Sequence, residues 1–144
     1  MAPSDGFVLD CSIALAWYFP DEADAYADYV QDSLAQAEAV VPSLWPLEVT
    51  NALVVGERRG RSTVAQATTW IALLKDLPIR IDRETVSRAW AETLQVARTH
   101  GLSAYDAAYL ELALRLGVGL ATLDGGLKAA AIAAGVPLYQ AKIP

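Results

Sequence analysis

The sequence predicts an α/β domain, with a central and mainly parallel β-sheet flanked by helices. Two observations lead to this prediction. Short apolar runs alternate along the chain with longer stretches that have helical periodicity, and strands separated by helices normally pair in parallel with helices on both faces. We find no internal repeat, low-complexity tract or linker in the 144 residues. One domain over residues 1–144 is therefore expected.

The composition suits a soluble protein with one substantial core. Hydrophobic residues make up 54% of the chain and charged residues 19%. The longest uncharged stretches, residues 62–74 and 129–141, are shorter than the roughly 18 apolar residues that a membrane span needs. The one cysteine, Cys11, cannot form an internal disulfide. We therefore expect a cytoplasmic protein without a membrane segment.

The first half of the chain reads as two strands and three helices. A buried apolar run begins it, and apolar stripes spaced for helices follow. Asp21 and Ser43 are the expected N-caps of the second and third helices, and Pro46 is tolerated in a first turn. In order, these elements are a strand at 7–10, helices at 12–18 and 21–38, a strand at 39–42 and a helix at 43–59.

The second half of the chain continues the alternation of strands and helices. Ser62 or Thr63, Asp82 and Ser103 each precede a helical stretch as candidate N-caps, and Gly101 and Gly117 follow helices as stop signals. The expected helices cover residues 63–78, 83–100, 103–117 and 127–134, and the expected strands cover 79–81, 118–123 and 136–139.

Two acids stand where an α/β sheet usually places its ligands, outside the carboxyl ends of the strands. Asp10 ends the first strand, and Asp124 directly follows the strand at 118–123. A carboxylate that ends a buried strand is costly without a partner. Each acid also has a structural explanation, because Asp10 can cap the next helix and Asp124-Gly125 is a turn dipeptide.

Two further acids lie early in helices. Glu48 is surrounded by apolar neighbours, and a Glu on a buried helix is rarely unpaired. Asp106 stands at a capping-box position, which would explain it without any chemistry. Glu48 also has a structural alternative, since the helix dipole favours an acid in the first turn. The four acids together are more informative than any one of them.

Four gathered carboxylates predict a divalent metal site. Clustered carboxylates repel and raise one another's pKa unless a cation neutralises them. Oxygen ligands suit Mg²⁺ or Mn²⁺, and such ions activate water for phosphoryl chemistry. No catalytic histidine is then required, and His100, the only one, stands at a helix end.

Charge and aromatic side chains suggest two contact surfaces. Residues 1–56 hold nine acids and no Lys or Arg, so any RNA contact must be local. Arg58, Arg59 and Arg61 are the candidate RNA-binding cluster, with a solvated helix end as the equal alternative. Trp17, Tyr18 and Phe19 form a candidate partner-binding patch, with burial in the core as the alternative.

Four segments resemble the PIN-domain family, and more narrowly the ribonuclease toxins of VapBC toxin–antitoxin pairs. They are Val8-Leu-Asp-Cys-Ser12, Leu47-Glu-Val-Thr-Asn-Ala-Leu53, Leu102-Ser-Ala-Tyr-Asp-Ala-Ala-Tyr-Leu-Glu-Leu-Ala113 and Ala121-Thr-Leu-Asp124. Their order and spacing are similar to those of the family over nearly the whole chain. The third segment is the most specific of the four.

The resemblance implies a five-stranded sheet of order 3-2-1-4-5 and a Mg²⁺- or Mn²⁺-dependent endoribonuclease. It also implies a homodimer that a cognate VapB-type antitoxin neutralises. Asp10, Glu48, Asp106 and Asp124 match the family's catalytic and metal-binding acids, and Ser12, Asn51 and Thr122 match its supporting polar positions.

Two other functions remain as alternatives. A PIN-like interaction module without activity would keep the fold, although the complete set of acids argues against it. An aspartyl-phosphate phosphatase or receiver-like domain also has an Asp after its first strand. Such a phosphatase would need a second Asp where this chain has Ser12, and a receiver would need a late Lys that Lys128 is poorly placed to supply.

Overall fold

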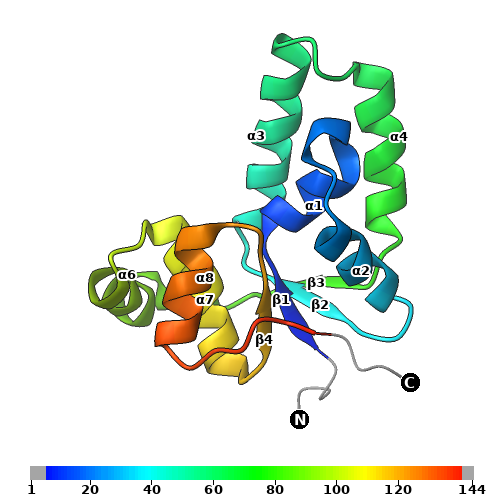
Figure 1. Cartoon of the computed structure of the whole chain (residues 1–144). Coiled ribbons are helices and arrows are strands. Elements are labelled where there is room, and N and C mark those ends of the chain that lie inside the picture. The colour runs from blue at the N-terminus through cyan, green and yellow to red at the C-terminus, as the bar shows by residue number, and fades with distance from the viewer. Residues whose placement is uncertain (1–5, 141–144) are drawn as a thin grey trace.

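The computed structural model describes residues 6–140 and contains a four-stranded, fully parallel sheet of order β3-β2-β1-β4 (Figure 1). The predicted parallel sheet and the order of its first four strands are confirmed. In Figure 1, helices α1 to α4 lie on one side of the sheet and α6 to α8 on the other. No helix in the described part of the chain is long and apolar enough to cross a membrane.

The strands are short, and β1 is central. They are β1 (Phe7–Leu9), β2 (Ala39–Val41), β3 (Ile79–Ile81) and β4 (Gly119–Ala121). The helices are α1 (Cys11–Tyr18), the 3-10 turn η1 (Pro20–Glu22), α2 (Ala25–Ser33), α3 (Trp45–Arg58), α4 (Val64–Lys75), α5 (Thr85–Arg88), the π-helical turn η2 (Ala89–Thr93), α6 (Leu94–His100), α7 (Ala104–Leu116) and α8 (Gly125–Ala133).

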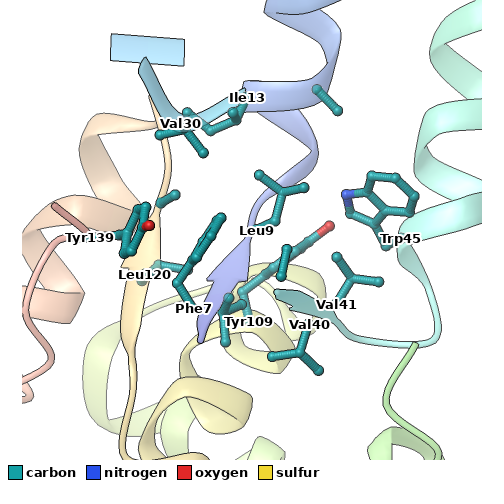
Figure 2. Close-up of a cluster of buried hydrophobic side chains, with 14 of the residues drawn as sticks. Phe7, Leu9, Ile13, Val30, Val40, Val41, Trp45, Tyr109, Leu120 and Tyr139 are labelled. Atoms are coloured by element: carbon teal, nitrogen blue, oxygen red, sulfur yellow. The ribbon is translucent and has the colours of Figure 1, made fainter. Parts of the chain in front are cut away.

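The core surrounds β1 on both faces. All three residues of β1 are fully buried, and Phe7 stacks on Tyr139 with 3.8 Å between the ring centroids (Figure 2). Tyr109 of α7 and Trp45 of α3 approach the same strand from other elements (Figure 2). Close packing of this kind fixes the direction of β1, and therefore the position of the residue that follows it.

The fifth strand is reduced to a single bridge. Leu138 pairs in parallel with Leu120 of β4, through hydrogen bonds from Leu120 N to Pro137 O and from Tyr139 N to Leu120 O. The expected position beside β4 is therefore correct, but the expected strand over 136–139 does not form. Pro137 has no N–H to donate to a longer ladder.

Two expected N-caps, Asp21 and Ser43, are wrong. Asp24, rather than Asp21, caps α2, and its Oδ1 accepts hydrogen bonds from Tyr26 N and Ala27 N. Helix α2 consequently covers Ala25–Ser33 instead of 21–38. Ser43 does not cap α3, because the helix begins later, with Leu44 at the N-cap position and no side-chain capping hydrogen bond. The caps at Thr63 and Ser103 are confirmed.

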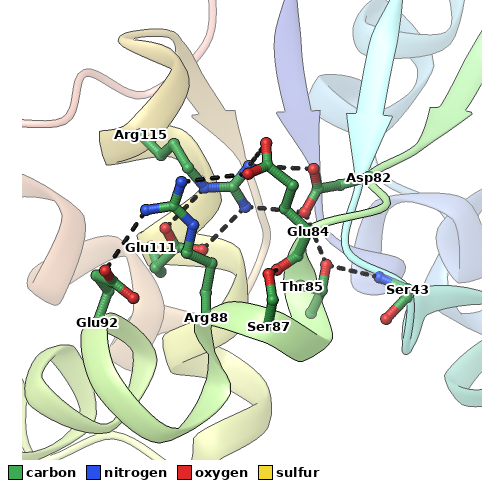
Figure 3. Close-up of polar contacts among 9 residues, drawn as sticks. All are labelled: Ser43, Asp82, Glu84, Thr85, Ser87, Arg88, Glu92, Glu111 and Arg115. Atoms are coloured by element: carbon green, nitrogen blue, oxygen red, sulfur yellow. Dashed lines mark hydrogen bonds and ion pairs between the residues drawn. The ribbon is translucent and has the colours of Figure 1, made fainter.

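Asp82 is the third wrong cap, because it is the buried partner of Arg115 (Figure 3). Arg115 Nη2 lies 2.8 Å from Asp82 Oδ2, and Thr85 Oγ1 donates to the same oxygen. Glu111 takes a further hydrogen bond from Arg115 Nε. Breaking a buried pair leaves a charge without compensation, so this network should hold the end of β3 against α7.

Asp82→Asn should destabilise the protein above about pH 4 and have less effect in stronger acid. Burial alone would raise the pKa of Asp82, but hydrogen bonds from Arg115 and Thr85 outweigh it and lower the pKa below the ordinary 3.8. A lowered pKa stabilises the fold above the unfolded-state value, and this contribution disappears as the pH falls through the folded-state value. Thermal melts from pH 7 to pH 2 measure the difference between variant and wild type.

The exposed Asp76→Asn is the matched control for that series. Its melting temperature should follow the wild type across the whole range. An Asp82→Asn protein whose deficit stays constant down to pH 2 would contradict the ion-pair explanation.

Candidate active site

Asp10 is the buried centre of the candidate site. It follows β1 directly, and only 5% of its surface is exposed. Its backbone N–H donates to Ala121 O, which continues the pairing of β1 with β4 by one residue. Asp10 occupies the N-cap position of α1, but its side chain makes no capping hydrogen bond. The cap explanation is thus wrong for this acid.

Two hydroxyl groups hold the Asp10 carboxylate. Ser12 Oγ and Thr122 Oγ1 both donate to Oδ2, at 2.6 and 2.7 Å. Ser12 Oγ accepts from Leu123 N, and Thr122 Oγ1 accepts from Asp124 N. The two hydroxyls therefore connect Asp10 to the loop between β4 and α8. We call Ser12 and Thr122, which hold Asp10, the hydroxyl clamp.

Glu48 enters from α3 and meets Tyr109 of α7. It lies in the first turn of α3 and is half-buried. Tyr109 is fully buried, and its hydroxyl donates a short hydrogen bond to Glu48 Oε1. Sequence reasoning did not assign Tyr109 a role. The signal that could have found it is its spacing, because Tyr109 comes three residues after Asp106 and shares a helix face with it.

Asp106 and Asp124 occupy helix starts near Asp10. Asp106 lies in the first turn of α7, where its N–H donates to Ser103 Oγ. Asp124 caps α8, and its Oδ2 accepts from Leu127 N at 2.8 Å. Asp124 therefore has a structural role, but as a helix cap and not in the expected Asp-Gly turn. Its carboxylate nevertheless raises the pKa of Asp10 and of Asp106, so it also faces the cluster.

The acids disturb one another electrostatically. Burial raises the pKa of Asp10, the clamp hydroxyls lower it, and Asp124 raises it again, with a net increase. Burial also raises the pKa of Glu48, and Asp10 and Asp106 add to this against the hydrogen bond from Tyr109. The pKa of Asp106 is raised by burial, Asp10 and Asp124. Such mutual repulsion is relieved by a bound cation.

The cluster is open rather than a closed coordination cage. Within residues 6–140, no three His, Cys, Asp or Glu side chains are grouped closely enough to hold an ion by themselves. Mg²⁺ keeps several of its waters and is usually bound through one or two carboxylates. An oxygen-only set around one buried carboxylate fits an ion held in that way. It does not fit zinc, which is normally held by nitrogen or sulfur ligands.

The remaining polar candidates make no hydrogen bond or ion pair with the four acids within residues 6–140. Asn51 is exposed on α3 and makes no hydrogen bond to the four acids in the described part of the chain. Arg58 and Arg59 are exposed at the end of α3. Arg61 is already engaged, because it pairs with Asp21 and Glu22 and lies 4.0 Å from the centre of the Phe19 ring.

The aromatic patch is mostly turned inward. Phe19 is 1% exposed, so the expectation that it lies on a contact surface is wrong. Arg61 covers its ring, and Tyr18 meets it edge to face. Trp17 is half-buried and donates from Nε1 to Ala27 O, which joins α1 to α2. Leu47, the neighbour of Glu48, is an exposed apolar side chain beside the acids, at 72%.

Comparison with known proteins gives one family and several relatives. Residues 7–133 match the model of the PIN domain family. Ribonuclease VapC3 of Pyrobaculum aerophilum is 28% identical over 117 residues, which cover 81% of this chain and 88% of that protein.

Solved structures agree on the fold. The crystal structure of PAE2754 from Pyrobaculum aerophilum superposes with a TM-score of 0.66 and 27% identity, covering 90% of this chain and 81% of that one. VapBC2 from Rickettsia felis, solved bound to a DNA fragment from its promoter, gives a TM-score of 0.61 over 93% of this chain and 97% of that one. Its identity of 14% supports the fold alone.

Asp124→Ala and Asp124→Asn should separate the capping role of Asp124 from its charge. Alanine removes the acceptor for Leu127 N and should cost about 1 kcal/mol of unfolding free energy, whereas asparagine caps nearly as well as aspartate. Asparagine also relieves repulsion with Asp10 and Asp106. Urea unfolding without metal should therefore leave Asp124→Asn at least as stable as the wild type. Equal losses in both variants would contradict this division of roles.

Proposed function

Because the chain belongs to the PIN-domain family, we propose that it is a ribonuclease toxin that cuts RNA with the help of Mg²⁺ or Mn²⁺. The observation that supports the proposal is the electrostatic interaction among Asp10, Glu48, Asp106 and Asp124, with Asp10 held by the hydroxyl clamp. The resemblance to ribonuclease VapC3 supports the substrate class. Family membership argues against the phosphatase and receiver alternatives.

Each acid has a distinct part in the proposed reaction. Asp10 is the central ligand, because the clamp hydroxyls fix its direction and favour its charged form. Glu48, Asp106 and Asp124 surround it and add negative charge, directly or through water. A cation bound there would activate water and stabilise charge on the phosphate. Arg58 and Arg59 are the proposed RNA contacts, and Arg61 is a weaker candidate since it is already paired.

Mn²⁺ should raise the melting temperature of the wild type, and Asp10→Asn should abolish this response. A cation that binds only the folded state stabilises it by about 2.7 kcal/mol at a hundredfold excess over its dissociation constant. Cleavage of a panel of structured RNAs should disappear in the same variant. The exposed acid Asp32→Asn is the matched control and should keep both responses. A full metal response in Asp10→Asn would remove Asp10 from the site.

The acidic first part of the chain supports an antitoxin as the partner. Residues 1–56 hold nine acids and no basic side chain, and an unneutralised carboxylate cluster attracts a guanidinium group. We propose a VapB-type antitoxin whose basic, amphipathic segment lies along the first helices and places a cation near Asp10. Leu47 is the better apolar anchor, since Phe19 is buried. A role of Trp17 and Tyr18 in binding the partner remains a prediction. Assembly as a homodimer and a cytoplasmic location also remain predictions.

Leu47→Ala should speed dissociation of that antitoxin, whereas Asp28→Asn should mainly slow association. An apolar anchor acts on the lifetime of a complex, and an exposed acid acts on the electrostatic encounter. Surface plasmon resonance against the small protein encoded beside this chain measures both rates, and added salt should lower the association rate. Ile132→Ala, on α8 across the sheet, is the control. A complex that is insensitive to Leu47 and to salt would contradict this surface.

A further inference from the structure

Tyr109 has a hydroxyl group where the core would accept an apolar residue. It is one of the largest fully buried side chains, packed in the same cluster as Leu9 and Val41 (Figure 2). A buried hydroxyl without a partner costs free energy. Here the hydroxyl donates to the carboxylate of Glu48, and it also contacts the Cys11 thiol. Hydrogen bonds to ionised groups are about twice as strong as neutral ones.

The hydrogen bond restrains a flexible side chain at a critical position. Glu48 is half-buried in the first turn of α3, and a free glutamate samples many rotamers. Tyr109 cannot move easily, because α7 is buried from Ala107 to Ala113. A rigid donor therefore fixes Oε1 of a mobile acceptor. The donor stands one turn after Asp106, so the helix that supplies one acid of the site also orients another.

We propose that Tyr109 is a positioning residue, which holds Oε1 of Glu48 and leaves Oε2 available for a cation. The inference rests on the proposed metal-dependent function and deepens it. Groups that orient the ligands of a metal usually contribute 10- to 100-fold to affinity or activity. Tyr109 acts through Glu48 and needs no contact with the RNA.

Tyr109→Phe removes the hydroxyl and keeps the ring, so it tests the proposal with little change in packing. Titration calorimetry of Mn²⁺ into the metal-free protein should show binding weaker by roughly tenfold or more. The kcat for RNA cleavage should fall while KM stays near the wild-type value. Tyr105→Phe is the matched control, because Tyr105 is 65% exposed on the same helix and should change neither quantity.

Combining Tyr109→Phe with a change at Glu48 distinguishes a positioning role of Tyr109 from a packing role. In Glu48→Ala protein, which has no side-chain oxygen for Tyr109 to hold, adding Tyr109→Phe should cause no further loss of Mn²⁺ affinity. An undiminished Mn²⁺ affinity in Tyr109→Phe, or an equal loss in both backgrounds, would overturn the positioning role and leave the proposed function intact. A wild-type protein that binds no Mn²⁺ at all would overturn the metal site, and the positioning role with it.

Discussion

The buried carboxylate of Asp10 is the feature on which the rest of the site depends. A carboxylate at the end of a buried strand is stable only when donors replace the water it has lost. Ser12 and Thr122 supply these donors, and each also receives an N–H from the loop that precedes α8. The hydroxyl clamp therefore does two things at once. It stabilises a charge in the interior, and it joins the start of α1 to the end of β4.

The parallel sheet explains why the other acids arrive nearby. Strand β1 lies between β2 and β4, so the segments that leave these strands emerge at one edge. Asp10 and Asp124 follow two paired strands, and Glu48 follows β2 in the first turn of α3. Asp106 is added by the start of α7, which packs against β1. The resulting repulsion is a stored electrostatic cost that a metal ion or a basic group of a partner can relieve.

The sequence was sufficient for features that depend on local pattern. Alternating apolar runs predicted the sheet, and the same pattern predicted that Asp10 and Asp124 follow strands. Features that depend on tertiary partners were missed. Asp82 resembles a helix cap until Arg115 is placed beside it. Phe19 resembles a surface anchor until Arg61 covers it. Tyr109 resembles an ordinary core aromatic until Glu48 is brought to its hydroxyl from a helix 61 residues earlier in the chain.

The most direct measurement is anomalous diffraction at the manganese edge from crystals soaked in Mn²⁺. If the four acids form one cation site around a fixed Asp10, the strongest peak lies beside the Asp10 carboxylate, with Glu48, Asp106 and Asp124 around it. This manganese peak should be absent from Asp10→Asn crystals, while the fold is unchanged. No peak at the acids, or a peak that persists there without the Asp10 carboxylate, would contradict the central role assigned to this residue.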